Sequence, residues 1–244
     1  MGSEMCIRDR YVCMQDKSTL SVKTFDVGPM LNIVYLIWDN TTKDAAIVNP
    51  AWDLTEVLNF TTQNGLKLRK ILLTHSHHDH VNSIDTLLKK YDLPIYINKF
   101  EASFWKKKYD NLITTGSNDT FSLGKSSVST IHTPGHTPGS CCYLFDKNLI
   151  AGDTLFVFGC GRCDLHGGNP EEMYNSLKNL KNNLDQNTII MPGHNYSIKR
   201  QSTIGEEITG NPFFSLDNLK DFVQYRMHDH DKTRQEPYAP ITYG

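Results

Sequence analysis

No apolar run in this sequence approaches the ~18 residues that a membrane-spanning helix requires. The first ten residues, MGSEMCIRDR, mix acidic and basic side chains and lack the apolar segment of a secretory signal. An excess of one charge is also missing, because 25 Lys and Arg stand against 27 Asp and Glu, for a net charge of −2. Such a balance provides no broad field for nucleic acid or an anionic membrane. We therefore expect a cytoplasmic protein with neither as a partner.

The sequence contains six cysteines, and we do not expect them to form a disulfide framework. Without a secretory signal we expect reduced thiols at Cys6, Cys13, Cys141, Cys142, Cys160 and Cys163. The last two form a C-x-x-C pair, but no second pair in the sequence completes a four-sulfur zinc site. This pair lies among glycines (GCGRC), whereas redox-active pairs usually open a helix. We interpret both as ordinary thiols, with a redox role as the alternative.

The 244 residues are enough for one domain with a sizeable core. Residues 1–13 resemble translated sequencing-adapter read-through, so we expect a non-native or disordered leader, with Met14 as a start site. Residues 14–230 are predicted to form the folded domain, and residues 231–244 a polar C-terminal tail. We expect His228 and His230 to lie in such polar surroundings without a role.

Strands and helices are predicted to alternate along the chain. Asp53 and Glu56 are spaced as in a capping box, and Asn169 before Pro170 is typical of a helix start. Apolar periodicity predicts helices from about residue 54, over 81–91, from residue 170 and over 219–227. A further helix, after the strand at 94–97, is predicted to carry the lysines 106–108 on its solvent face. Short β-branched and aromatic runs predict strands at 32–38, 45–48, 70–73, 94–97, 127–132, 141–145, 149–151 and 188–191. This order is typical of an α/β fold with two helix-covered sheets.

A dense group of metal-ligand side chains follows the strand predicted at 70–73: His75, His77, Asp79 and His80. Imidazole and carboxylate groups both bind zinc well. Residues i and i+2 of an extended segment point the same way. His75 and His77 can therefore hold one ion while Asp79 and His80 turn towards a second. The pattern H-x-H-x-D-H favours a metal site over a purely structural role.

Three further segments each place one ligand-type side chain in a tight turn after a predicted strand. HTPGHTPGS supplies His136, AGDTLF supplies Asp153 and MPGHNYS supplies His194. Small neighbours in these turns leave room for an ion. Each residue alone would be as readily structural, but their recurrence after the first group favours a joint site.

These motifs, in this order, resemble the metallo-β-lactamase superfamily and, within it, the hydroxyacylglutathione hydrolase (glyoxalase II) branch. The resemblance runs from about Val22 to Met227 and implies a four-layer αββα sandwich with the metals at one edge between the sheets. It implies two zinc ions, although iron and manganese suit the same ligand types. The implied ligands are His75, His77 and His136 for one metal, Asp79, His80 and His194 for the other, and Asp153 as the bridge.

The reaction implied by such a centre is hydrolysis. Two ions ~3.5–4 Å apart share a hydroxide, because metal binding lowers the pKa of water from about 15.7 to roughly 7. One ion also polarises the scissile carbonyl, and the other accepts the leaving group. Asp79 is the predicted catalytic residue, since its carboxylate can hold the hydroxide proton. No Ser or Cys nucleophile is required.

The segment GCGRCDLHGGNPEEMYNSL indicates the substrate class. It resembles the glutathione-contacting loop of glyoxalase II, with Arg162 at the basic position but Cys163 and Asp164 in place of an aromatic pair. VNPAWDL, GCGRCDLHGG and FVQYRM are instead similar to zinc-dependent hydrolases found with polyketide synthases. Both resemblances imply cleavage of an acyl thioester on a small-molecule thiol or a carrier protein. The predicted substrate-binding residues are Arg162, His166 and Arg226.

Two alternatives stay open. A persulfide dioxygenase with one iron resembles this chain in GCGR and the ligand set, and metal content with oxygen consumption would separate it. A metal-binding module without turnover is the alternative from another class.

Two remaining histidines are expected outside the ligand set, since His78 is out of phase and His132 precedes the ligand turn. A role for His132 in orienting a ligand is the second interpretation of that residue.

Overall fold

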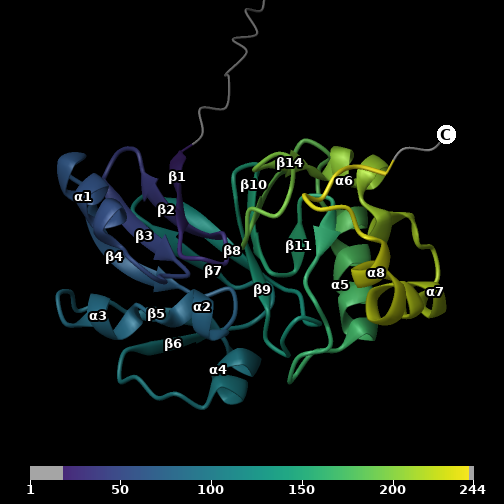
Figure 1. Ribbon diagram of the computed structural model, residues 1–244. Coiled ribbons are helices and arrows are strands. Elements are labelled where there is room, and N and C mark those ends of the chain that lie inside the picture. Colours follow the sequence, from purple (N-terminus) through teal and green to yellow (C-terminus); the bar gives the residue numbers. More distant parts are fainter. Residues whose placement is uncertain (1–18, 242–244) are drawn as a thin grey trace, which may run out of the picture.

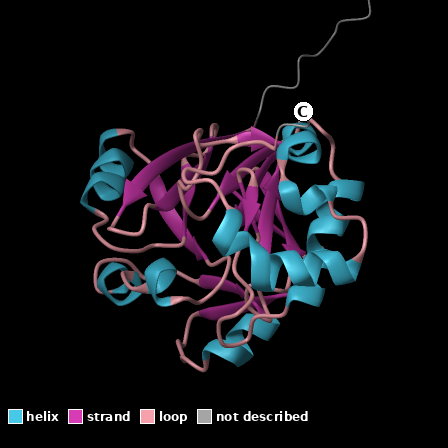
Figure 2. Ribbon diagram, turned by 45° about the vertical axis from the view of Figure 1, so that its right-hand side comes forward, coloured by secondary structure: helices cyan, strands magenta, loops and turns pink. Residues whose placement is uncertain are grey.

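A computed structural model describes residues 19–241, so the predicted leader, with Cys6 and Cys13, lies outside the described residues. Two six-stranded sheets form the centre of the fold, and helices cover their outer faces (Figures 1 and 2). This order of layers confirms the predicted αββα sandwich. Within the described range, no helix combines the length and apolar character needed to span a bilayer.

The first sheet has the order β1-β2-β3-β4-β5-β6, antiparallel from β1 to β3 and parallel from β3 to β6. Its strands are β1 Leu20–Val27, β2 Asn32–Asp39, β3 Asp44–Val48, β4 Lys67–Leu72, β5 Ile95–Asn98 and β6 Leu112–Thr115. Parallel neighbours require crossover connections. These contain α1 Thr55–Gln63, α2 His78–Val81, α3 Ile84–Leu88 and α4 Lys99–Trp105.

The second sheet has the order β14-β13-β10-β9-β8-β7 and is antiparallel except between β10 and β13. Its strands are β7 Thr120–Leu123, β8 Ser126–His132, β9 Cys141–Phe145, β10 Asn148–Gly152, β13 Ile189–Pro192 and β14 Ser202–Thr203. Two short strands, β11 Leu155–Phe156 and β12 Gly159–Cys160, pair beside it. The carboxyl ends of β8, β10 and β13 lead into the turns predicted to carry ligands.

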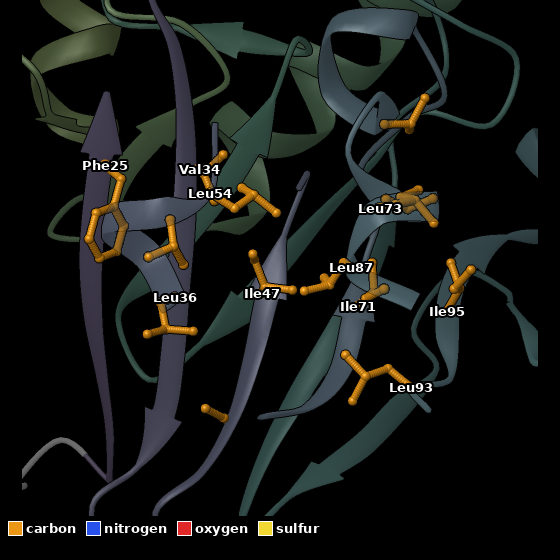
Figure 3. Packing of buried hydrophobic residues seen from close by; sticks show 14 of the residues in the cluster. Phe25, Val34, Leu36, Ile47, Leu54, Ile71, Leu73, Leu87, Leu93 and Ile95 are labelled. Atoms are coloured by element: carbon orange, nitrogen blue, oxygen red, sulfur yellow. The ribbon is translucent and has the colours of Figure 1, made fainter. Parts of the chain in front are cut away.

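Strand β2 shows how one sheet contributes to two cores. Successive side chains of a strand point to opposite faces. Val34 and Leu36 pack in the core with residues of α1 and α3, which Figure 3 shows from close by. Ile33, Tyr35 and Ile37 instead pack between the two sheets. Because both faces are buried, β2 is a continuous apolar run in the sequence.

Helix α5, Pro170–Asn183, covers the outer face of the second sheet (Figure 1). The Asn169 side chain accepts hydrogen bonds from the backbone N–H groups of Glu171 and Glu172, which confirms the predicted cap. The buried stripe includes Met173 and Leu177, in one core with apolar residues of β10 and β13. This core fixes the sheet whose strand ends carry three ligand turns.

Helix α1 begins one residue later than predicted and without a capping box. Leu54 occupies its N-cap position and makes no side-chain capping bond. Asp53 Oδ1 accepts instead from Thr55 N at 2.9 Å and from Thr55 Oγ1 at 2.6 Å. The Asp53 carboxylate is therefore satisfied within its own turn, and Glu56 has no part in the cap.

The helix predicted over 81–91 is shorter, because α2 ends at Val81 and only α3, Ile84–Leu88, lies within the predicted range. Asn82 and Ser83 separate them, because both side chains bond the backbone of Trp52. Asn82 Oδ1 accepts from Trp52 N at 2.6 Å, and Ser83 Oγ donates to Trp52 O at 2.5 Å. Polar side chains that bond to backbone compete with helix continuation.

Helix α4 ends before the lysines at 106–108, so the prediction that a helix carries them was wrong. Lys106 is its C-cap residue and adopts a left-handed conformation with φ of 59°. A left-handed residue ends an α-helix. The lysines therefore lie in the exposed loop that follows α4.

The C-terminal segment folds back over the second sheet. It contains α6 Ile204–Gly210, a 3-10 helix Pro212–Ser215, α7 Leu219–Gln224, a π-helical turn Tyr225–Asp229 and α8 His230–Thr233. The placement of His230 in polar surroundings was wrong, because its ring is 2% exposed and lies 4.8 Å from the Phe213 ring. His228 is exposed as predicted. Beyond α8, Tyr238 is buried, and its N–H donates to Tyr196 O at 2.8 Å.

Glu207 on α6 is a fully buried carboxylate. It accepts hydrogen bonds from Phe158 N, Ser202 Oγ and Asn211 Nδ2. Burial raises the pKa of Glu207 from 4.5 to about 7, although these three donors act in the opposite direction. Folding therefore favours the protonated form of Glu207. Its contribution to stability is fully present below pH 4.5 and is lost as the pH rises through about 7.

We predict that Glu207→Gln removes this pH-dependent term. The free energy of unfolding of the variant, relative to that of the native chain, should rise by about 3 kcal/mol between pH 4.5 and pH 8. Urea unfolding followed by circular dichroism at several pH values, in one fixed metal state, measures the difference. An offset between the two proteins that is the same at every pH would contradict the prediction.

Candidate metal centre

Four strand ends bring the predicted ligands together at one edge of the two sheets. β4 leads into the segment 75–80, and β8, β10 and β13 lead into the turns that carry His136, Asp153 and His194. His75, His80, His136 and His194 are all at most 3% exposed. Gly193 is required at the last turn, because a Cβ there would lie 2.1 Å from Asp153 Oδ1. The small residue before His194 thus lets this turn approach the one that carries Asp153.

The ligand atoms form three overlapping groups, in each of which all the atoms lie within 4.8 Å of one another. The first two groups share His75, and the last two share His80. They are His75, His77 and His136; His75, His80 and Asp153; and Asp79, His80 and His194. The structure therefore brings all seven predicted ligands into one cluster.

Two pairs of imidazole nitrogens face each other across the cluster. His77 Nδ1 lies 2.8 Å from His136 Nε2, and His80 Nε2 lies 3.1 Å from His194 Nε2. The Asp153 carboxylate lies between them, with one oxygen 3.4 Å from His80 Nε2 and the other 3.2 Å from His194 Nε2. Lone pairs that converge in this way are the arrangement a bound cation needs.

Two buried polar atoms of the cluster lack a hydrogen-bond partner among the described residues: His75 Nε2 and Asp153 Oδ1. Such atoms are costly in a folded protein unless a ligand or ion satisfies them. Both are acceptors when the imidazole is neutral at Nε2. This chemistry fits metal ions, and the residues present are suited to hold them.

Oxygen acceptors orient three of the ligand rings. His136 Nδ1 lies 2.8 Å from Arg162 O, His194 Nδ1 lies 2.8 Å from Met30 O, and His75 Nδ1 lies 3.1 Å from Thr74 Oγ1. A ring that donates its Nδ1 proton keeps the lone pair on Nε2 for a metal. These backbone and hydroxyl partners are contacts that the ligand motifs alone do not indicate.

Burial governs the protonation of the cluster. Burial lowers the pKa of His136 to about 4 and holds the pKa of His75 well below its usual value. Both imidazoles are therefore neutral at pH 7, which is the form that binds a metal. Burial also disfavours charge on His194, but the neighbouring Asp153 carboxylate outweighs it and raises the pKa of His194 to about 9.

Asn32, at the start of β2, fixes the catalytic candidate Asp79. Its Nδ2 lies 2.8 Å from Asp79 Oδ2 and 3.1 Å from Asp79 O. Trp52 Nε1 in turn donates to Asn32 Oδ1 at 2.9 Å, which sets the orientation of the amide. Sequence reasoning missed Asn32, because nothing local in NIVYLIW shows that it lies beside Asp79.

Glu101 on α4 is a second residue that sequence reasoning missed. It is fully buried and joins the two loops that carry His75, His77 and His136. Oε1 accepts from Ser76 N at 2.8 Å, and Oε2 accepts from Thr137 Oγ1 at 2.7 Å and from Gly139 N at 3.0 Å. The two loops are thus held at a fixed separation by one carboxylate.

The remaining predicted residues lie in different surroundings. Arg162 and Arg226 line a cavity of about 650 Å³ that opens beside the ligands. His166 is exposed, stacks on Phe104 at 5.3 Å and does not line this cavity. His78 is exposed, as expected. His132 lies 3.0 Å from Pro138 O through Nε2 and stacks on Phe100 at 5.1 Å.

The four described cysteines are free, and all of them are buried. Burial raises the pKa of Cys160 to about 12, and the pKa of Cys163 is raised for the same reason. A reactive cysteine requires a lowered pKa and exposure. The C-x-x-C pair therefore has the character of ordinary thiols, as predicted.

The comparison with family models decides the family. The model of the metallo-beta-lactamase superfamily matches residues 27–194, a range that includes every predicted ligand. The chain belongs to the metallo-beta-lactamase superfamily. This confirms the resemblance stated from the sequence and the metal-binding character of the cluster.

Two relatives within this superfamily carry enzyme names. The probable polyketide biosynthesis zinc-dependent hydrolase PksB of Bacillus subtilis (strain 168) is 33% identical over 201 residues, which cover 82% of this chain and 89% of that protein. Hydroxyacylglutathione hydrolase of Shewanella halifaxensis (strain HAW-EB4) is 36% identical over 169 residues, which cover 68% of this chain and 63% of that protein. Both branches named from the sequence are thus represented, and they support a hydrolase.

Solved structures confirm the fold. ETHE1 from Myxococcus xanthus has a TM-score of 0.78 at 24% identity, covering 85% of this chain and 90% of that one. At this identity the likeness shows the metallo-beta-lactamase fold alone. TTHA1623 in a di-iron-bound form has a TM-score of 0.66 at 28% identity, covering 78% of this chain and 99% of that one. Iron is therefore a metal that a superfamily member of similar structure holds.

We predict that Glu101→Ala weakens metal binding by about 10- to 100-fold, because the loop N–H groups lose their acceptor and the ligand loops separate. Chelator competition measures the affinity, and thermal unfolding of the metal-free variant shows whether the fold persists. Glu56→Ala, on the exposed side of α1, is the matched control and should leave the affinity unchanged. Native affinity in a folded Glu101→Ala protein would disprove the role of this carboxylate.

Proposed function

We propose that this protein is a hydrolase of acyl thioesters that works with two zinc ions. The observation that carries the proposal is the complete cluster of seven ligand side chains beside a cavity of about 650 Å³. Cavities of roughly 300–1,000 Å³ suit small-molecule substrates. The relatives named as a zinc-dependent hydrolase and a hydroxyacylglutathione hydrolase support the metal and the thioester class.

In this proposal His75, His77 and His136 would hold one metal, Asp79, His80 and His194 would hold the other, and Asp153 would complete the ligand set. When bound, metal ions in such a site supply Lewis acidity, which lowers the pKa of water and polarises a carbonyl group. His77, Asp79, His136, Asp153 and His194 line the cavity, whereas His75 and His80 do not. A substrate in the cavity therefore meets one face of the cluster.

Asp79 is the residue that we assign to proton transfer. Its side chain is 16% exposed and lines the cavity, so its carboxylate is accessible to a substrate. Asn32 Nδ2 holds Asp79 Oδ2 and fixes the carboxylate plane. A carboxylate that is both oriented and accessible can accept the proton of the attacking water. Arg162 and Arg226 also line the cavity, and we assign them to binding of the thiol part of the substrate.

The proposal predicts thioesterase activity that depends on zinc. Purified protein should contain about two zinc ions per chain and hydrolyse at least one S-acyl conjugate in a panel of glutathione, coenzyme A, pantetheine and carrier-protein thioesters. Chelation should abolish hydrolysis, and added zinc should restore it. One iron per chain with oxygen consumption on glutathione persulfide would favour the dioxygenase alternative. Two bound metals without hydrolysis would favour a binding module.

Asp79→Asn should reduce turnover by orders of magnitude and weaken the second metal, because an amide neither accepts the proton nor binds zinc as a carboxylate does. Metal content and steady-state kinetics measure both effects. Asp79 is a surface-accessible side chain at the cavity, so the far-UV spectrum should remain native. Normal activity in the variant would contradict the assigned role.

A further inference from the structure

We call residues 234–241, drawn in yellow after α8 in Figure 1, the C-terminal strap. Its backbone is hydrogen-bonded to the segment that follows the ligand His194. Tyr238 N donates to Tyr196 O at 2.8 Å, and Ile198 N donates to Tyr238 O at 2.9 Å. The strap is therefore attached to the chain only two residues beyond a metal ligand.

The segment that the strap contacts connects His194 to strand β14. Between β13 and β14, residues 195–201 belong to no strand of the two sheets. Ser197 and Tyr238 instead form an isolated parallel bridge. Connecting segments are more mobile than the strands that they join. The bonds to the strap therefore supply order that the sheet does not supply at this point.

Tyr196 carries the contact from this segment to the ligand. Its ring is stacked on the His194 imidazole, with the centroids 4.7 Å apart and the planes at 8°. Phe156 packs edge-on against both rings, at 5.8 Å from His194 and 5.4 Å from Tyr196. Because His194 Nδ1 also lies 2.8 Å from Met30 O, one edge and one face of the imidazole are both held.

The ring of Tyr238 packs against Tyr196 in turn, edge-on, with the centroids 6.1 Å apart and the planes at 71°. Tyr238 is 7% exposed and belongs to a small apolar cluster that includes Phe156. A Cβ at Gly159 would lie 2.7 Å from the Tyr238 ring, so the first glycine of GCGR provides space for this ring. Both the backbone and the ring of Tyr238 therefore hold Tyr196 in place.

We propose that Tyr238 is a positioning residue of the metal centre, which holds Tyr196 against His194 and thereby strengthens binding of the metal at His194. The role rests on the proposed function only in that His194 is assigned to a metal, and it does not depend on the thioester substrate. Groups that orient a ligand without touching the metal typically contribute about 10- to 100-fold to metal affinity. Tyr238 acts one residue farther out, so its contribution should be smaller.

Metal affinity is the quantity to measure. Tyr196 and Tyr238 both line the cavity, so a loss of turnover alone would not separate positioning from substrate contact. Co²⁺ is a substitute for zinc that absorbs visible light, and it can be titrated into the full-length metal-free protein without substrate. His194→Ala identifies, by its loss, the absorption of the site that contains His194.

Tyr238→Ala should weaken Co²⁺ binding at the His194 site by about 3- to 10-fold in chelator competition, because the stack on His194 loses its support. Binding at the other site should stay at the native level. Tyr238→Phe keeps the ring and loses only the hydroxyl that Arg234 Nη1 bonds at 3.2 Å. It should therefore restore nearly native affinity.

Tyr196→Leu tests the inner contact and should weaken the same site by about tenfold, because it removes the stack itself. Tyr196 is half-buried, so this variant tests the role even where Tyr238→Ala does not fold. Tyr174→Ala is the matched control, since it removes a ring on α5 that packs edge-on against Phe222 at 5.4 Å and does not line the cavity. It should lower the Tm but leave Co²⁺ binding unchanged.

Native Co²⁺ affinity at the His194 site in folded Tyr238→Ala or Tyr196→Leu protein would overturn the positioning role and leave the thioesterase proposal intact. An equal loss in Tyr174→Ala would also overturn it, since general destabilisation would then account for the effect. A His194→Ala protein that keeps both ions would refute the ligand assignment, and the positioning role with it. Because no substrate enters the measurement, absence of thioester hydrolysis would count against the proposed function alone.

Discussion

Seven side chains that are all suited to bind a metal ion lie close together at one edge of this fold. Folding alone does not favour such a cluster, because it buries imidazoles and carboxylates and leaves His75 Nε2 and Asp153 Oδ1 without partners among residues 19–241. The high pKa of His194 and the low pKa of His136, a few ångströms apart, are consequences of the same crowding. The rest of the structure has to hold these groups in place despite the free-energy cost of burying them.

The frame that holds them is made of strand ends and a few buried polar groups. Strands fix the ligand turns to within the precision of a hydrogen-bonded sheet, and close approach of Gly193 to Asp153 brings two turns together. Glu101 and Asn32 then connect segments that the sheets leave independent. These contacts orient the ligand side chains through groups outside the ligand set.

The ligands could be predicted from the sequence because each motif is local: a strand signal, a turn and a ligand within a few residues. The layers could be predicted for a similar reason, since the apolar run of β2 and the helical spacing of apolar residues in α5 are visible in the sequence. Long-range partners could not be predicted, because nothing within KFEASFW shows that Glu101 meets Ser76 and Gly139. Helix ends also failed where single side chains decided them, as with Lys106 in its left-handed conformation. His230 was misjudged for the same reason, because its apolar partner Phe213 lies 17 residues earlier.

The residues that line the cavity come from different parts of the chain. Strand ends of both sheets supply the ligands, so a change there disturbs the core and the metals together. The arginines that line the cavity come instead from the loop after β12 and from the segment that follows α7, which packs back beside Tyr196 through Tyr238. The loop after β12 also contacts a ligand, because Arg162 O lies 2.8 Å from His136 Nδ1. Because this contact is made by backbone, the side chain at position 162 can change while the carbonyl that orients His136 stays in place.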